Sequence, residues 1–171
     1  MNVALIGYRG CGKTTIGRRL ADRLWEKFID VDDQIVAKAG KSIKDIFAQD
    51  GEAHFRDLET QVLQDIAPLK DHVLGLGGGS IIREQNRQLL RAWADKIIYL
   101  KCDARILHRR IEKDPRSADM RPNLTQLGGG LAEIEAKLAE REALYREVKD
   151  IELDVSNLSE EEAVAYIGRF L

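Results

Sequence analysis

Short apolar runs alternate with segments of helical periodicity along most of the chain. Strands are predicted where apolar runs end at polar or glycine-containing turns, over residues 3–6, 28–31, 73–76, 97–100 and 151–155. Helices are predicted over residues 14–25, about 52–66, 84–93, 104–112, 131–148 and 160–170, with Ser159 as a cap for the last. Apolar strands separated by helices are typical of a parallel sheet covered on both faces. We therefore predict a three-layer α/β fold with five parallel strands.

Two segments interrupt this alternation. Residues from Asp32 to about 60 have helical periodicity but no strand, and we predict that they form an inserted flap that binds a second substrate. Residues 113–130 carry two X-Pro pairs, Arg116 and a glycine triplet, which is typical of a hinged lid; we place the lid at about 113–128. A plain surface loop is the alternative for the second segment. We predict that residues 1–171 form one domain.

The first predicted strand leads into the run GYRGCGKTT, which starts at Gly7 and fits the phosphate-loop pattern G-x-x-x-x-G-K-[ST]. Glycines let backbone N–H groups curl around phosphate oxygens. We expect Lys13 to reach the β and γ phosphates, and the Thr14 hydroxyl to ligate Mg²⁺. The predicted nucleotide-binding residues of this loop are Gly10, Cys11, Gly12, Lys13, Thr14 and Thr15. The alternative is a glycine-rich turn before an ordinary helix.

Composition narrows the class of partner. The formal net charge is −2 and no basic stripe is present, so we predict a small-molecule substrate and no nucleic acid. Cys11 and Cys102 have neither paired spacing nor companion histidines, which favours a reducing, cytoplasmic location. No apolar run approaches the roughly 20 residues of a membrane span, and the chain enters its first strand too early for a signal segment. We expect a monomer that does not bind membranes.

Two carboxylates are predicted at the end of the second strand, where ligands bind in open parallel sheets. Asp30 and Asp32 should lie on the same side, because side chains alternate along a strand. We expect Asp30 to hold Mg²⁺ through its water shell and Asp32 to accept the proton of an attacking hydroxyl. A helix N-cap is the alternative, and it is the preferred interpretation for Asp33.

Further motifs follow in a specific order. They are DIFxxxGExxFR from Asp45 to Arg56, LGGG ending at Gly79, and a later RP at Arg121. With the phosphate loop and the DVD of Asp30 to Asp32, the set resembles the shikimate kinase family across nearly the whole chain. The resemblance implies a P-loop NTPase fold and a cytoplasmic enzyme of the chorismate pathway. Its expected activity is transfer of the γ-phosphoryl group of ATP to the 3-hydroxyl of shikimate, with Mg²⁺.

The resemblance also implies substrate-binding roles for matching positions. Asp32 would bind the shikimate hydroxyls and act as the base, while Arg56 and Arg141 would pair with the substrate carboxylate, which suits a planar guanidinium fork. The backbone of Gly77, Gly78 and Gly79 would approach the acceptor ring, with amide donors facing a hydroxyl.

Arg121 and Arg110 would act on the nucleotide. Arg121 would close over the transferring phosphoryl group, so that the expected catalytic residues are Lys13, Asp32 and Arg121. Arg110 would stack on adenine, or would instead belong to a solvated helix face. The alternatives to a shikimate kinase are a related small-metabolite kinase, such as a gluconate kinase, and a non-catalytic ligand-sensing module of the same fold.

Overall fold

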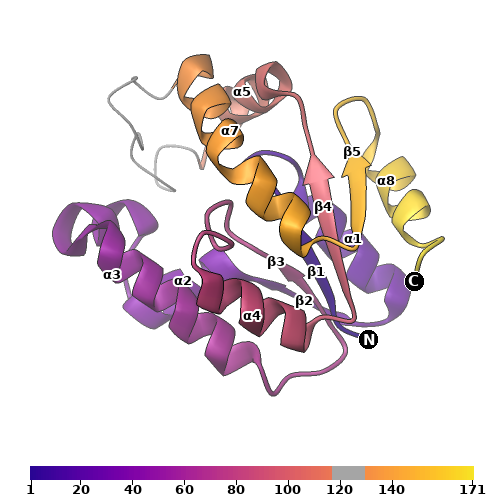
Figure 1. Ribbon diagram of the computed structural model, residues 1–171, viewed down its shortest axis with the longest axis horizontal. Coiled ribbons are helices and arrows are strands. Elements are labelled where there is room, and N and C mark those ends of the chain that lie inside the picture. Colours follow the sequence, from indigo (N-terminus) through magenta and orange to yellow (C-terminus); the bar gives the residue numbers. More distant parts are fainter. Residues whose placement is uncertain (117–129) are drawn as a thin grey trace.

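The computed structural model describes residues 1–116 and 130–171. Its centre is a sheet of five parallel strands in the order β2-β3-β1-β4-β5 (Figure 1). The strands are β1 (Val3–Ile6), β2 (Lys27–Asp30), β3 (His72–Gly75), β4 (Lys96–Lys101) and β5 (Ile151–Asp154). The predicted five-stranded parallel sheet is confirmed, with strand ends shifted by one residue in most cases.

Helices connect the strands. In the described residues they are α1 (Lys13–Leu24), α2 (Val31–Ala39), α3 (Ile43–Ile66), α4 (Glu84–Trp93), α5 (Ala104–Lys113), α7 (Leu131–Val148) and α8 (Glu160–Ile167). Ser159 caps α8 as predicted, in a capping box with Glu162. The backbone of α3 breaks at Gly51, whose φ of 86° is left-handed. The prediction of a helix from about residue 52 therefore matches the part of α3 that follows the break.

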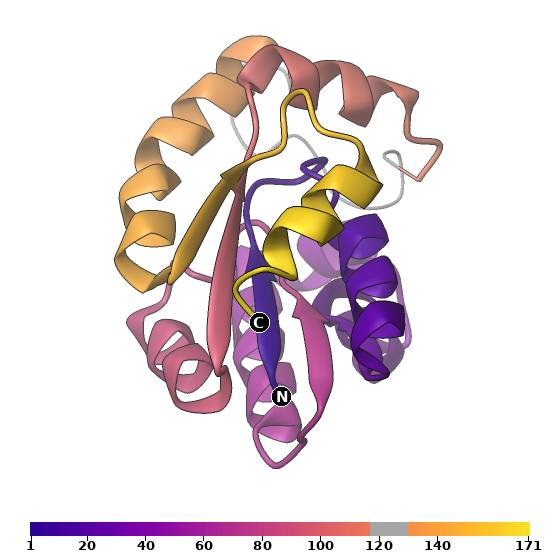
Figure 2. The ribbon, with the colours of Figure 1, turned by 90° about the vertical axis from the view of Figure 1, so that its right-hand side faces the viewer.

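The sheet is buried on both faces by two separate apolar cores. In β1, Ala4 and Ile6 face the core formed with α2, α3, α4 and α7, whereas Val3 and Leu5 face the core formed with α1 and α8. All four side chains are at most 1% exposed, which is why the strand reads as a continuous apolar run. Figure 2 shows α7 (orange) and α1 (indigo) on opposite sides of the strands, consistent with three layers.

The connections open a crevice at one edge of the sheet. Helix α1 leaves the carboxyl end of β1 on one face, and α4 follows the carboxyl end of the neighbouring β3 on the opposite face. Chains that depart in opposite directions leave space between two adjacent strand ends, which is where open α/β sheets bind ligands. Within the described residues no helix is both long and apolar enough to cross a membrane.

The close packing of α1 on β2 gives a stability prediction at Gly17. A Cβ added at Gly17 would lie 2.3 Å from the Phe28 ring and 3.2 Å from Leu5. Alanine normally stabilises a helix interior relative to glycine, but here we expect Gly17→Ala to destabilise the fold by about 1–3 kcal/mol through overpacking. Urea unfolding followed by circular dichroism measures the change. The double variant with Phe28→Leu should recover most of the loss; an unchanged or higher stability of Gly17→Ala alone would contradict the prediction.

Candidate active site

A cavity of about 470 Å³ lies at the carboxyl ends of β1, β2 and β3. It brings together eleven of the predicted site residues: Gly10, Cys11, Gly12, Lys13, Thr14, Thr15, Asp30, Asp32, Gly77, Gly78 and Arg110. Residues that the sequence interpretation missed also line it: Arg9, Asp114, Arg116, Val155, Leu158, Ser159 and Glu160. Several of these come from the segment before α8, whose place beside the phosphate loop depends on the strand order and has no local sequence signal.

The phosphate loop joins β1 to α1 in a conformation that requires glycine. Gly12 is the N-cap of α1 with a left-handed φ of 98°, and a Cβ at Gly7 would lie 2.5 Å from the carbonyl oxygen of Leu100. The Lys13 ammonium folds back over the loop and donates to the carbonyl oxygens of Gly7, at 2.8 Å, and Tyr8, at 2.9 Å. The loop thus holds its lysine at the cavity, which fits an anion site.

Asp30 connects the phosphate loop to the second strand. Thr14 Oγ1 donates to Asp30 Oδ2 at 2.7 Å, and the Asp32 amide donates to Asp30 Oδ1 at 3.0 Å. The prediction that strand alternation places the two carboxylates on one side is wrong, because β2 ends at Asp30 and α2 begins at Val31. Asp30 is the helix N-cap, the role considered as the alternative, and Asp32 lies in the first turn of α2. Both nevertheless line the cavity.

The Thr14–Asp30 pair has the chemistry of a magnesium site. Hydroxyl and carboxylate oxygens are the hard donors that Mg²⁺ prefers, and here two of them lie 2.7 Å apart at the start of α1. Burial, followed by repulsion from Asp32, raises the pKa of Asp30. A half-buried carboxylate beside a second carboxylate is a favourable place for a divalent cation, which relieves that repulsion.

The raised pKa of Asp30 predicts that this carboxylate lowers the stability of the fold, although it supports metal binding. Because the folded pKa lies above the unfolded one, ionised Asp30 opposes folding at neutral pH; this cost shrinks as the pH falls below the folded pKa and is gone below the unfolded pKa. Asn is an equally good N-cap: its single amide oxygen can accept from the Asp32 amide, while its NH₂ group donates to the Thr14 hydroxyl. We expect Asp30→Asn to melt no lower than the parent at pH 7, while Mg²⁺-dependent activity falls by about 10–100-fold. A lower melting temperature with unchanged Mg²⁺ dependence would contradict both parts.

The second side of the cavity is the glycine loop, defined here as Gly77 to Gly79, of which Gly77 and Gly78 line the cavity. Among the hydrogen bonds of the described residues, none uses the amide of Gly77, Gly78 or Gly79. A Cβ at Gly79 would lie 2.5 Å from Arg56 Nη2, and one at Gly78 would lie 3.6 Å from Arg141 Nη1. The structure therefore brings both predicted arginines to this loop, although 85 positions separate them in the sequence.

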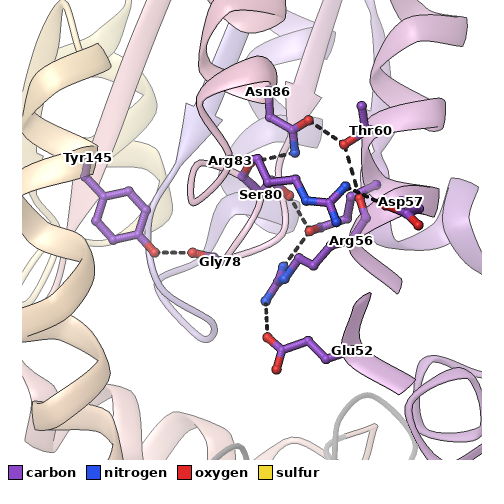
Figure 3. A network of polar contacts seen from close by, with 10 residues as sticks. Glu52, Arg56, Asp57, Thr60, Gly78, Ser80, Arg83, Asn86 and Tyr145 are labelled. Carbon is purple, nitrogen blue, oxygen red and sulfur yellow. Dashed lines mark hydrogen bonds and ion pairs between the residues drawn. The ribbon is translucent and has the colours of Figure 1, made fainter. Parts of the chain in front are cut away.

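A buried polar network holds Arg56 (Figure 3). Arg56 Nη1 donates to Glu59 Oε2 at 2.5 Å, and Ser80 Oγ donates to Glu59 Oε1 at 2.6 Å. Arg56 is 5% exposed and Glu59 is fully buried. Buried charges are costly unless paired, so the pair fixes the guanidinium with little freedom. Glu59 was missed from the sequence, because its helical segment also carries Glu52, Asp57 and Asp65 and no local signal distinguishes the buried carboxylate from the exposed ones.

Two further residues, Arg110 and Arg121, were predicted to act on the nucleotide. Arg110, near the end of α5, is half-buried and its Nη1 lies 3.4 Å from the carbonyl oxygen of Gly10, so it faces the cavity and not a solvated helix face. Arg121 lies in 117–129, outside the described residues, as does most of the predicted lid.

The fold and the cavity define a class of protein, the P-loop phosphotransferases. The features that place the chain in this class are the parallel α/β sheet, the phosphate loop, the candidate magnesium pair and the facing glycine loop flanked by arginines. Comparison with known proteins narrows the class. The family model described as shikimate kinase matches residues 9–171. The chain belongs to the shikimate kinase family.

Individual relatives agree with this assignment. The chain is 38% identical to a shikimate kinase of Rhodopirellula baltica over 163 residues, covering 95% of this chain and 86% of the relative. It is 37% identical to that of Pelotomaculum thermopropionicum, covering 99% and 95%. Among solved structures, shikimate kinase from Acinetobacter baumannii in complex with shikimate superposes with a TM-score of 0.90 at 33% identity, covering 99% of this chain and 91% of that one.

Proposed function

We propose that this protein transfers the γ-phosphoryl group of ATP to the 3-hydroxyl of shikimate, giving shikimate 3-phosphate. One observation carries the proposal: Arg56 and Arg141 converge on the glycine loop, which forms the wall of the cavity that faces the phosphate loop. Two guanidinium groups beside the glycine-loop amides suit a small hydroxylated carboxylate. Membership of the shikimate kinase family supports the same acceptor.

The mechanism consists mainly of positioning and electrostatics. Arg56 and Arg141 would fix the acceptor carboxylate, and the glycine-loop amides would bind a hydroxyl. Asp32, on the cavity wall, would accept the proton of the 3-hydroxyl as its oxygen bonds to the γ-phosphorus and the bond to the bridging oxygen of ADP breaks. Lys13 would exchange the carbonyls of Gly7 and Tyr8 for phosphate oxygens.

Thr14 and Asp30 would hold Mg²⁺, with Asp30 acting through the metal's water shell. When bound, the ion neutralises charge on the phosphates. Arg110 would contact the adenine side of ATP, and Arg121 would approach the transferring phosphoryl group from a lid at about 113–128. Residues 32–60 would form the acceptor flap of a single domain, and we propose a monomeric, cytoplasmic enzyme.

The test is an acceptor-dependent assay. Purified protein receives ATP and Mg²⁺ with shikimate, gluconate, a nucleoside monophosphate or no acceptor, and ADP release is followed by a coupled assay. We expect release above the acceptor-free rate with shikimate only, and loss of that release when EDTA replaces Mg²⁺. Phosphorus–proton coupling in the NMR spectrum of the product identifies the phosphorylated carbon.

The other outcomes separate the alternatives. Turnover only with gluconate would keep the kinase and reject the acceptor, which would then be a different small acid. ATP binding without turnover on any acceptor would favour a ligand-sensing module. A product phosphorylated at another carbon would contradict the role given to Asp32.

A further inference from the structure

The glycine loop is anchored from two helices. On one side, Tyr145 of α7 donates its hydroxyl to the carbonyl oxygen of Gly78 at 2.5 Å (Figure 3). On the other, the Asn86 side-chain amide of α4 donates to the carbonyl oxygen of Ser80 at 2.9 Å. The mechanism uses the loop but gives Tyr145 no role.

The bond from Tyr145 sets the direction of one particular amide. The carbonyl of Gly78 and the N–H of Gly79 belong to the same planar peptide and point in opposite directions. Fixing the carbonyl toward Tyr145 therefore aims the Gly79 amide away from α7. A Cβ at Gly79 would lie 2.5 Å from the Arg56 guanidinium, so Gly79 lies beside one of the two arginines proposed to bind the acceptor. Peptides flanked by glycines rotate more freely than others, and a single hydrogen bond restricts them strongly.

Tyr145 is well held for this purpose. Its side chain is fully buried, and its ring stacks on Tyr99 with a centroid distance of 4.9 Å. Burial raises its pKa, so the hydroxyl keeps its proton and remains a donor. Arg141 lies one turn earlier on α7, with its guanidinium over the Tyr8 ring at 5.7 Å. One rigid helix thus carries both a carboxylate-binding arginine and the group that orients the glycine loop.

We propose that Tyr145 is a positioning residue for the acceptor: its hydroxyl holds the Gly78–Gly79 peptide so that the Gly79 amide donates to the acceptor. It does not touch the substrates. The inference rests on the proposed function for the identity of the acceptor, but the orientation of the peptide is independent of it.

The test removes only the hydroxyl, in Tyr145→Phe. The matched control is Tyr99→Phe, which removes the hydroxyl of the stacked neighbour; no hydrogen bond of the described residues joins that hydroxyl to the glycine loop. We expect Tyr145→Phe to raise KM and the calorimetric Kd for shikimate by about 3–10-fold, as for the loss of one hydrogen bond. KM for ATP should stay within about twofold in both variants.

Two further measurements separate positioning from lost stability. The first uses Ile66→Val, a substitution in the buried core at the last residue of α3. We expect it to lower the melting temperature but to keep the parent KM for shikimate. In ¹H–¹⁵N spectra without ligand, the Gly79 amide should shift in Tyr145→Phe and stay in place in Tyr99→Phe. This second readout needs no acceptor.

The outcomes are distinct. Failure of the parent protein to use shikimate would reject the proposed function, and the comparison of variants would then be made with the acceptor that the parent does use. An unmoved Gly79 amide and an unchanged acceptor KM in Tyr145→Phe would reject the positioning role. Equal losses for ATP and acceptor, matched by Ile66→Val, would show that Tyr145 only stabilises the fold.

Discussion

Asp32→Asn is expected to lower kcat by about 10²–10⁴-fold while leaving ATP affinity within a small factor of the parent. An amide has the shape of the carboxylate but cannot accept the proton of the 3-hydroxyl. The fold should tolerate the change, since the Asp32 contact that ties α2 to Asp30 is made by its backbone amide. Steady-state kinetics with shikimate varied, together with calorimetric binding of ATP, measure the two effects separately.

Asp33→Asn is the matched control. Asp33 is the next residue in the first turn of α2, carries the same charge, is exposed and is not among the described residues that line the cavity. Both substitutions remove one negative charge near the N-terminus of the helix, so a general electrostatic effect would appear in both. Comparable losses of kcat in the two variants, or equal losses of ATP binding and turnover in Asp32→Asn, would contradict the role of Asp32 as proton acceptor.

Lys13→Ala is expected to lower kcat by about 10²–10³-fold and also to weaken ATP binding. In the proposed mechanism the ammonium would stabilise charge on the phosphates as the γ-phosphoryl group moves, so part of its effect should appear only in the transition state. In the structure the same ammonium donates to two loop carbonyls, and its removal should make the loop less ordered. Shikimate binding in the absence of nucleotide should be unchanged.

Lys27→Ala controls for the loss of a lysine. Lys27 is exposed at the start of β2, at the opposite end of the strand from Asp30. It should retain parental kinetics for both substrates. If Lys13→Ala kept its turnover and lost only ATP affinity, the lysine would be a binding residue without a part in the chemical step.

Local sequence predicted well where one short segment decides the outcome. The five strands were found because each is a short run with apolar residues that ends at a turn, although only the inner strands β1, β3 and β4 are buried along most of their length. The phosphate loop was found because the glycine positions and the lysine are adjacent in the chain. The cap at Ser159 was found for the same reason. Asp30 and Asp32 were placed by the wrong rule, since the helical turn that starts at Val31 replaced the expected strand alternation. Both nevertheless line the cavity, because Asp30 is the last residue of β2 and Asp32 follows two residues later.

The sequence by itself determined the class of fold and the phosphate loop, because periodicity and motif spacing are local properties of the chain. The residues proposed for acceptor binding came from the resemblance to the family. Only the tertiary structure decided which residues that are distant in the sequence come into contact. It placed Arg56 and Arg141 on one glycine loop, buried Glu59 and Ser80 behind Arg56, and aimed Tyr145 at Gly78. The physical reason is that these contacts depend on the order of the strands and on the face of the sheet to which each helix returns, which packing of the whole chain determines.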